Sequence, residues 1–370
     1  MRIGSRKPTG ERLERMRASP LWDGKGFRNQ HPILPGLRDP KRMMPSMSEF
    51  LSGRKLSVPG KPLPAMNPLV HWTKPAVSGL RATWLGHSTV LLEMDGIRIL
   101  TDPVWGLRAS PSSFIGPKRF QPVPAALDAL PRVDLVVISH DHYDHLDFPT
   151  IRQLAKSDVA FVTPLGVGAH LEAWGIQPQR IVELDWWQSH AVPNTDLVVT
   201  ATPSQHFSGR GLTDRNATLW SSFVLRSPSA SVFFSGDTGL TTEYQSIGEL
   251  FGPFDLVMLE VGAFHPAWGH MHLGPENALK AHQLLGGGAL LPIHWGTFSL
   301  APHAWDQPIE FLLNAIVPLN SRLLLPRLGE PVEPALWYFS DAWWRGIHDA
   351  EADSVAIERR LGRSGSWRHE

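Results

Sequence analysis

Several short apolar runs in this chain end at a residue that can bind a metal, and this pattern constrains the fold more than any other. The runs, each with the polar residue that follows it, are 134–139 before His140, 197–201 before His206, 231–235 before Asp237 and 289–293 before His294. Apolar runs of this length, bounded by turn residues, are typical of strands buried in a sheet. Strand ends gather at one edge of a layered fold, where active sites are found. The sequence therefore predicts an α/β fold with a polar site at a sheet edge.

Other local patterns agree with this fold class. Residues 89–93 and 97–101 flank Asp95-Gly96, a dipeptide that favours the two-residue turn of a β-hairpin. Two more apolar runs and two helical patterns follow in the chain: 159–163 and 255–259 for strands, 148–155 and 275–285 for helices. Pro275 suits the first position of a helix. We expect residues 81–340 to form one α/β domain with two mixed sheets and outer helices.

The first 80 residues differ in composition from the rest. They hold 15 Lys and Arg against 5 Asp and Glu, a net charge of +10, which leaves −10 for residues 81–370. Eleven of the 33 prolines also fall there, and proline interrupts helices and central strands. Residues 1–80 are therefore predicted to be an arm that packs on the body, with contact to substrate or to a membrane surface as the alternative. Residues 341–370 are expected to be a helical, charged tail.

Composition excludes several classes of protein. The 370 residues include no Cys, so disulfides, thiol nucleophiles and cysteine-bound zinc or iron–sulfur centres are ruled out. A formal net charge of zero argues against a protein that binds nucleic acid through its phosphates. The first twenty residues lack the apolar stretch of a signal peptide, and no run approaches the roughly 20 apolar residues of a membrane-spanning helix. We expect a cytoplasmic location, with peripheral membrane contact as an extension of it.

The segment from His140 to His145 is the strongest local signal. In an extended chain His140 and His142 project to the same side, so two imidazoles can reach one ion. As the loop turns, Asp144 and His145 can face a second position at roughly the 3.5–4 Å spacing of a two-metal hydrolytic site. Three histidines and an aspartate within six residues, at the end of a buried strand, indicate a metal loop rather than a solvated turn.

The order of these motifs resembles that of the metallo-β-lactamase-fold hydrolases. Their hallmark is His-x-His-x-Asp-His, followed by a His, an Asp after Gly, and a last His, and the chain matches it throughout. The resemblance implies a four-layer αβ/βα sandwich and two zinc ions, with manganese or iron as the other candidates. It implies the following ligands: His140, His142 and His206 for the first metal; Asp144, His145 and His294 for the second; and Asp237 as a bridge between them.

Within that superfamily the chain looks most like the N-acylphosphatidylethanolamine-hydrolysing phospholipase D family and its bacterial relatives. The segments that carry this resemblance are 84–89, 100–103, 108–112, 116–120, 184–187, 234–239, 252–255 and 293–298. The implied activity is hydrolysis of a phosphodiester in N-acylphosphatidylethanolamine-like phospholipids by a metal-bridging hydroxide. A lactonase or sugar-phosphate hydrolase similar to L-ascorbate-6-phosphate lactonase is the alternative. A nuclease is disfavoured because residues 81–370 are net acidic.

Further residues receive roles beside the ligands. Asp144 or Asp237 could orient the hydroxide and accept its proton, and His272 is expected to polarise the substrate or protonate the leaving group. The remaining candidates are Lys118, Arg119 and His270 for substrate binding, and His87 and Asp102 as partners that fix the metal ligands. The expected partners are a small-molecule or phospholipid substrate, no nucleic acid and, by default, a second copy in a homodimer.

Overall fold

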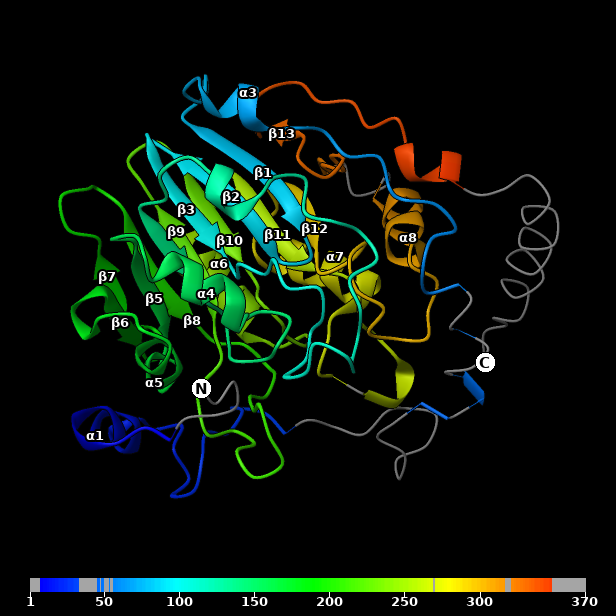
Figure 1. Ribbon diagram of the computed structural model, residues 1–370. Helices are drawn as coiled ribbons and strands as arrows, with labels where there is room; N and C mark the ends of the chain where they lie inside the picture. Colours follow the sequence, from blue (N-terminus) through cyan, green and yellow to red (C-terminus); the bar gives the residue numbers. More distant parts are fainter. Residues whose placement is uncertain are drawn as a thin grey trace.

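The computed structural model describes residues 7–32, 45, 46, 48, 49, 53, 56–268, 270–316 and 321–347 (Figure 1). The predicted arm lies partly outside these residues, and the expected tail does so from residue 348 onward. No helix in the described part of the chain is long and apolar enough to cross a membrane. The described residues form two sheets with helices on their outer faces.

The first sheet has seven strands in the order β13-β1-β2-β3-β4-β5-β6. The bounds are β1 Leu80–Gly86, β2 Thr89–Met94, β3 Ile97–Thr101, β4 Leu135–Val137, β5 Ala160–Pro164, β6 Ile181–Leu184 and β13 Pro331–Val332. Strands β1 to β3 pair antiparallel, whereas β3 to β6 pair parallel. The β2–β3 hairpin turns at Asp95, which has a positive φ of 49°, as the Asp-Gly dipeptide predicts.

The second sheet has six strands in the order β12-β11-β10-β9-β8-β7. The bounds are β7 Ser189–Ala191, β8 Val198–Thr202, β9 Ser222–Arg226, β10 Ser231–Phe234, β11 Leu256–Glu260 and β12 Ala289–Ile293. Strands β10 to β12 pair parallel, and β7 to β10 pair antiparallel. Both sheets are therefore mixed, as expected.

Helices complete the outer layers and the arm (Figure 1). The α-helices are α1 Gly10–Ala18, α3 Leu69–Trp72, α4 Phe148–Leu154, α5 Gly168–Ala173, α6 Glu243–Phe251, α7 Gly274–Leu284 and α8 Gln307–Ala315. Short 3₁₀ helices are η1 Leu127–Ala129, η2 Pro178–Arg180, η3 Pro266–Trp268 and η5 Trp343–Ile347. Helix α7 includes Pro275 in its first turn, where the missing N–H costs no hydrogen bond.

Two hydrophobic cores hold the layers together. On β2, Leu91 packs in a core with residues of α4 and α5, whereas Val90 and Leu92 face the other core. This second core contains residues of both sheets and of α6 and α7, so it lies between the sheets and continues to the outer helices. The alternation along one strand puts apolar side chains on both sheet faces. The predicted four-layer αβ/βα sandwich is confirmed.

Candidate metal centre

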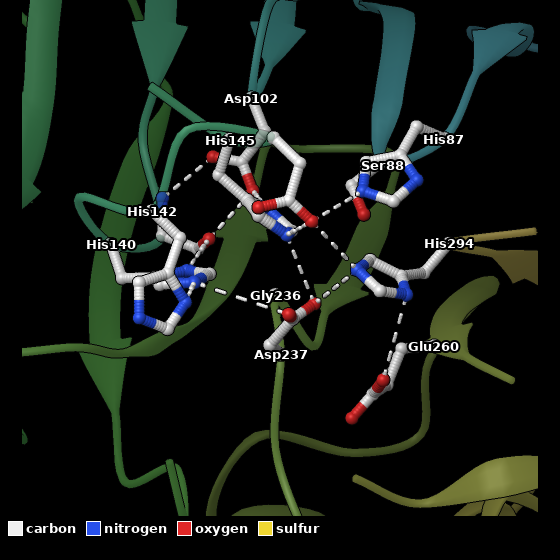
Figure 2. Close-up of polar contacts among 12 residues, drawn as sticks. His87, Ser88, Asp102, His140, His142, His145, Gly236, Asp237, Glu260 and His294 are labelled. Atoms are coloured by element: carbon white, nitrogen blue, oxygen red, sulfur yellow. Dashed lines mark hydrogen bonds and ion pairs between the residues drawn. The ribbon is translucent and has the colours of Figure 1, made fainter. Parts of the chain in front are cut away.

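The predicted ligands lie close together at the ends of strands from both sheets, and Figure 2 shows His140, His142, His145, Asp237 and His294 among them. The loop that carries His140 to His145 follows β4 of the first sheet, while His206, Asp237 and His294 follow β8, β10 and β12 of the second. Each apolar run forms a strand that is buried in its sheet. The polar residue after each run comes just beyond the strand, where the chain leaves the sheet. The centre is therefore built by both sheets.

One group of side chains comprises His140, His142, His206 and Asp237, with one ligand atom of each within 4.8 Å of the others. His140 Nε2 lies 2.9 Å from His142 Nδ1, and His206 Nε2 lies 3.3 Å from the same atom. Asp237 Oδ2 is 3.9 Å from His140 Nε2 and 3.8 Å from His206 Nε2. Three imidazoles and a carboxylate in this space form a ligand set suited to zinc.

A second group comprises His87, Asp144, His145 and His294, again with one ligand atom of each within 4.8 Å of the others. Asp144 Oδ2 lies 3.0 Å from His87 Nε2, 3.5 Å from His145 Nε2 and 3.4 Å from His294 Nε2. The sequence predicts His87 as a partner that fixes a metal ligand, and in the structure its ring lies beside Asp144, within reach of the same space. Burial and the nearby His294 lower the pKa of His87 to about 3, and a neutral ring can donate its Nε2–H to Asp144.

Asp237 lies between the two groups (Figure 2). Its Oδ1 is 3.2 Å from both His145 Nε2 and His294 Nε2. Its Oδ2 faces His140 and His206 in the other group. Each carboxylate oxygen thus serves one group, the arrangement that a residue shared by two cations requires.

The lone-pair nitrogen and oxygen atoms of the centre are arranged to bind cations rather than to form hydrogen bonds with one another. Three of these atoms are buried and lack a hydrogen bond within the described part of the chain: His145 Nε2, His294 Nε2 and Asp237 Oδ1. Asp237 Oδ1 nevertheless lies 3.2 Å from each of the two nitrogens. Buried polar atoms without a hydrogen bond are costly and rare. A soft or borderline divalent cation is the ligand that such converging nitrogen and oxygen lone pairs accept.

The electrostatics of the centre also indicate a demand for positive charge. Burial alone would lower the pKa of His145, but Asp237, Asp144 and Asp102 outweigh burial and hold this pKa well above its usual value. Against the same effect of burial, Asp237 and Asp144 raise the pKa of His294 to about 10. The carboxylates thus raise the proton affinity of these imidazoles, and bound cations would compete with protons for the same nitrogen atoms.

Asp102 anchors the second group from behind. It is fully buried, and its Oδ2 lies 2.7 Å from His145 Nδ1. It also accepts hydrogen bonds from the backbone N–H and the hydroxyl of Ser139, at 2.7 and 2.6 Å. An imidazole held through Nδ1 presents Nε2 to the metal. The structure therefore places Asp102 where the sequence predicts a partner of a metal ligand.

His272 lies at the edge of the centre beside a residue that the sequence patterns did not identify. Its Nδ1 is 2.7 Å from Glu260 Oε2, and its ring centroid is 5.0 Å from that of His206. Glu260 is fully buried at the end of β11 and also accepts hydrogen bonds from the backbone N–H groups of Thr238 and Leu273. Burial would lower the pKa of His272, but the Glu260 carboxylate raises it overall. Glu260 directly follows the apolar run 255–259, which is the same signal that marks the ligands.

The predicted substrate residues do not join either group. Arg119 is buried and donates to the carbonyls of Val104 and Gly106, at 2.6 and 3.2 Å. Its guanidinium lies 4.7 Å over the ring of Phe298, and the centroid of that ring is 5.2 Å from the ring of His87. Lys118 and His270 are exposed, and the carbonyl of His270 packs against Gly239. Their roles in substrate binding stay predictions.

Comparison with known proteins agrees with this geometry. Residues 97–295 match the model of a family described as the beta-lactamase superfamily domain, which is more than half of the chain. The chain belongs to the beta-lactamase superfamily. It is a metal-dependent hydrolase with the metallo-β-lactamase fold, and the predicted resemblance at this level is confirmed.

The chain is also similar to individual proteins, one of which is named for an activity on phospholipids. An uncharacterized protein of Mycobacterium tuberculosis is 45% identical over 331 residues, which is 88% of each chain. N-acyl-phosphatidylethanolamine-hydrolyzing phospholipase D 1 of Caenorhabditis elegans is 40% identical over 234 residues, covering 60% of this chain and 65% of that protein. The solved isothiocyanate hydrolase from Delia radicum gut bacteria superposes with a TM-score of 0.56 at 20% identity, covering 68% of this chain and 98% of that one. The last similarity shows the shared fold.

Proposed function

We propose that this protein is a di-metal phosphodiesterase of the phospholipase D type, acting on N-acylphosphatidylethanolamine-like phospholipids. The observation that carries the proposal is the pair of ligand groups that share Asp237. Similarity to a worm enzyme named for this reaction supports the choice of substrate. We assign the first metal to His140, His142 and His206, the second to Asp144, His145 and His294 with His87 as a further candidate, and Asp237 to both. Zinc is the default ion.

The exposed side of the centre suits an amphiphilic substrate. Asp144 and His272 have side chains that are 15% and 14% exposed, while Asp237 and His294 are almost fully buried. The ring centroid of Phe207 lies 4.6 Å from that of His142, and the ring centroid of Trp268 lies 6.1 Å from that of His272. Aromatic side chains thus border the polar groups, which is the mixture that a phosphate carrying acyl chains needs.

The reaction adds the oxygen of water to phosphorus and breaks the bond to the ethanolamine oxygen, which leaves with a proton. Two cations held by the two groups would supply a water of lowered pKa and positive charge for the phosphate oxygens. With Nδ1 donating to Glu260, His272 keeps Nε2 to hold or transfer the leaving-group proton. Asp144, at the exposed side, is placed to orient water.

The test is metal analysis by mass spectrometry together with hydrolysis of a substrate panel. We expect about two metals per chain, and release of N-acylethanolamine and phosphatidic acid from N-acylphosphatidylethanolamine in mixed micelles. Asp237→Asn should abolish this activity because it weakens both metal positions. Glu276→Gln, on the exposed side of α7, is the matched control and should leave it unchanged.

Two results would contradict the proposal. Hydrolysis of lactones with no hydrolysis of any phosphodiester would assign the chain to the alternative activity, a lactonase. A protein with less than one metal per chain, and no gain in activity on adding zinc or manganese, would remove the two-metal assignment itself. Membrane contact and a homodimer belong to the proposal and are tested by binding to lipid vesicles and by the mass in solution.

A further inference from the structure

The N-terminal arm reaches the metal centre through one side chain. Asn29 donates from Nδ2 to the carbonyl of His206 at 2.7 Å, and its Oδ1 accepts the backbone N–H of His206 at 3.1 Å. These two bonds join residues that lie 177 positions apart in the sequence. The amide of Asn29 therefore pairs with both backbone groups of one metal ligand, in the way that a neighbouring strand would.

A third bond fixes the amide itself. Trp220 donates from Nε1 to Asn29 Oδ1 at 3.2 Å and also to the carbonyl of Ser204 at 2.9 Å. Trp220 is 1% exposed and packs with Met16 and Phe27 of the arm. Because the donors and acceptors match only one orientation of the amide, Asn29 is held rather than free to rotate.

The ring of His206 has its own anchor. Its Nδ1 lies 3.0 Å from the carbonyl of Met271, which leaves Nε2 facing His142 and Asp237. The ring orientation thus comes from Met271, and the backbone position comes from Asn29. His206 is followed by a loop rather than a strand, so the sheet ladder does not hold its backbone groups, and the arm does so instead.

We propose that Asn29 is a positioning residue that sets the affinity of the first metal position through His206. The arm is then a part of the metal centre rather than only a strap on the surface of the body. Removing partners that orient a ligand costs about 10- to 100-fold in metal affinity. The expected effect is limited to one of the two metals, since Asn29 contacts only His206 among the ligands.

Zinc affinity of the full chain, measured by competition with a chromophoric chelator, tests this directly. Asn29→Ala should lower the affinity for one of the two zinc ions by about 10- to 100-fold. This ion should be the one that His206→Ala fails to bind. The double variant should bind no more weakly than His206→Ala alone, because both changes act through one ligand. Gln30→Ala, an exposed neighbour in the arm, is the control and should bind both ions as the wild type does.

A second variant separates positioning from simple attachment of the arm. Asn29→Asp keeps the size and the accepting oxygen but replaces the donor to the His206 carbonyl, so it should weaken the same ion even if Asn29→Ala does not fold. An arm that is only attached predicts a Tm lowered equally in metal-free and zinc-loaded protein, with both affinities unchanged, and that result would overturn the proposal. The test needs no substrate, so it stands apart from the proposed phosphodiesterase activity.

Discussion

At the scale of single residues, Glu260 is the side chain whose surroundings define its task most narrowly. It is fully buried and accepts three hydrogen bonds, one of them from His272 Nδ1. Its Oε2 also lies 3.9 Å from His294 Nδ1. A carboxylate in this position fixes the tautomer and the orientation of His272, whose Nε2 is the atom that remains for substrate.

Glu260→Gln is expected to lower kcat by about 10- to 100-fold, the cost of losing such an outer partner, with zinc content little changed. If Glu260 acts through His272, the double variant with His272→Ala should be no slower than His272→Ala alone. Steady-state kinetics and metal analysis of the three variants check this. Additive losses, or loss of zinc in Glu260→Gln, would instead connect Glu260 to His294.

Asp102 gives a prediction about stability. Its two oxygens accept three hydrogen bonds from His145 and Ser139 in a fully buried place. In Asp102→Asn an amide nitrogen must face one of these donors, so at least one buried bond is lost, at a cost of about 1–3 kcal/mol. Urea unfolding of the metal-free protein measures this cost. The exposed Asp128→Asn is the matched control, and an equal effect in both variants would refute the special role of Asp102.

Whether a residue of the centre could be predicted from the sequence depends on how far away in the sequence its partners lie. The loop from His140 to His145 was predictable because its spacing places four side chains that can bind a metal within six residues. Asn29 was not, because nothing near it in the sequence indicates a partner 177 residues away. His87 was recognised only as a supporting residue, since its distance to Asp144 depends on how β1 and β4 are arranged in the sheet.

At the scale of elements, helix α4 shows how the metal loop is terminated. Asp147 caps this helix by accepting from the backbone N–H of Thr150 at 3.2 Å. The same carboxylate accepts from the backbone N–H of Gly106 at 3.1 Å, which ties the loop after β3 to the helix. The metal loop ends two residues before this cap, so the helix gives the loop a fixed end.

Asp147→Ala removes these two interactions and the hydrogen bond from the Thr150 hydroxyl. It should lower the free energy of unfolding by about 1–2 kcal/mol, the upper part of the range for a lost N-cap. Asp147→Asn retains an acceptor and should lose less. Chemical unfolding at constant zinc concentration compares the two. Equal losses in both variants, or none in Asp147→Ala, would show that the cap does not stabilise α4.

Strand β1 shows where reading apolar runs fails at this scale. Its sequence includes Arg81, which interrupts the run, and yet the whole strand is buried. Arg81 lies opposite Glu93 on β2, and their side chains form an ion pair of 2.5 Å with exposures of only 7% and 6%. A buried charge is tolerated only when it is paired, and the partner of Arg81 is known only once the strand register is known. The runs of β4, β5, β8, β10, β11 and β12 contain no such charge in their interiors, and they were predictable.

At the scale of the whole molecule, the two oppositely charged parts of the chain are in contact. Arg12 of α1 lies 2.5 Å from Glu183 and 2.6 Å from Glu172, and Arg15 donates to the Glu183 carbonyl. Part of the positive charge of residues 1–80 is therefore neutralised by ion pairs within the molecule and is not available to bind a partner. This favours a packed arm over a free basic tail for the described residues of that segment.

Both sheets contribute candidate ligands to the same centre, so bound metal would link the two halves of the sandwich. Without cations, the side chains of the two groups face one another, and the carboxylates of Asp144 and Asp237 raise the pKa of His145 and His294. With cations, the same side chains become ligands held from two sheets at once. The fold was predictable from local patterns, but this dependence of the two halves on one centre follows only from their arrangement in space.

Removal of metal should therefore lower the stability of the whole molecule and not only its activity. A metal present at 100 times its dissociation constant stabilises the folded state by about 2.7 kcal/mol, so two metals should contribute about twice that. Calorimetry before and after chelation, with metal loss verified by mass spectrometry, should show one transition that moves to lower temperature and recovers on adding zinc. Asp237→Asn should show a smaller shift, since it starts with weaker binding at both positions. An unchanged Tm after complete removal would mean that the sheets alone hold the centre together, and a shift confined to a separate, minor transition would mean that the metals stabilise one half only.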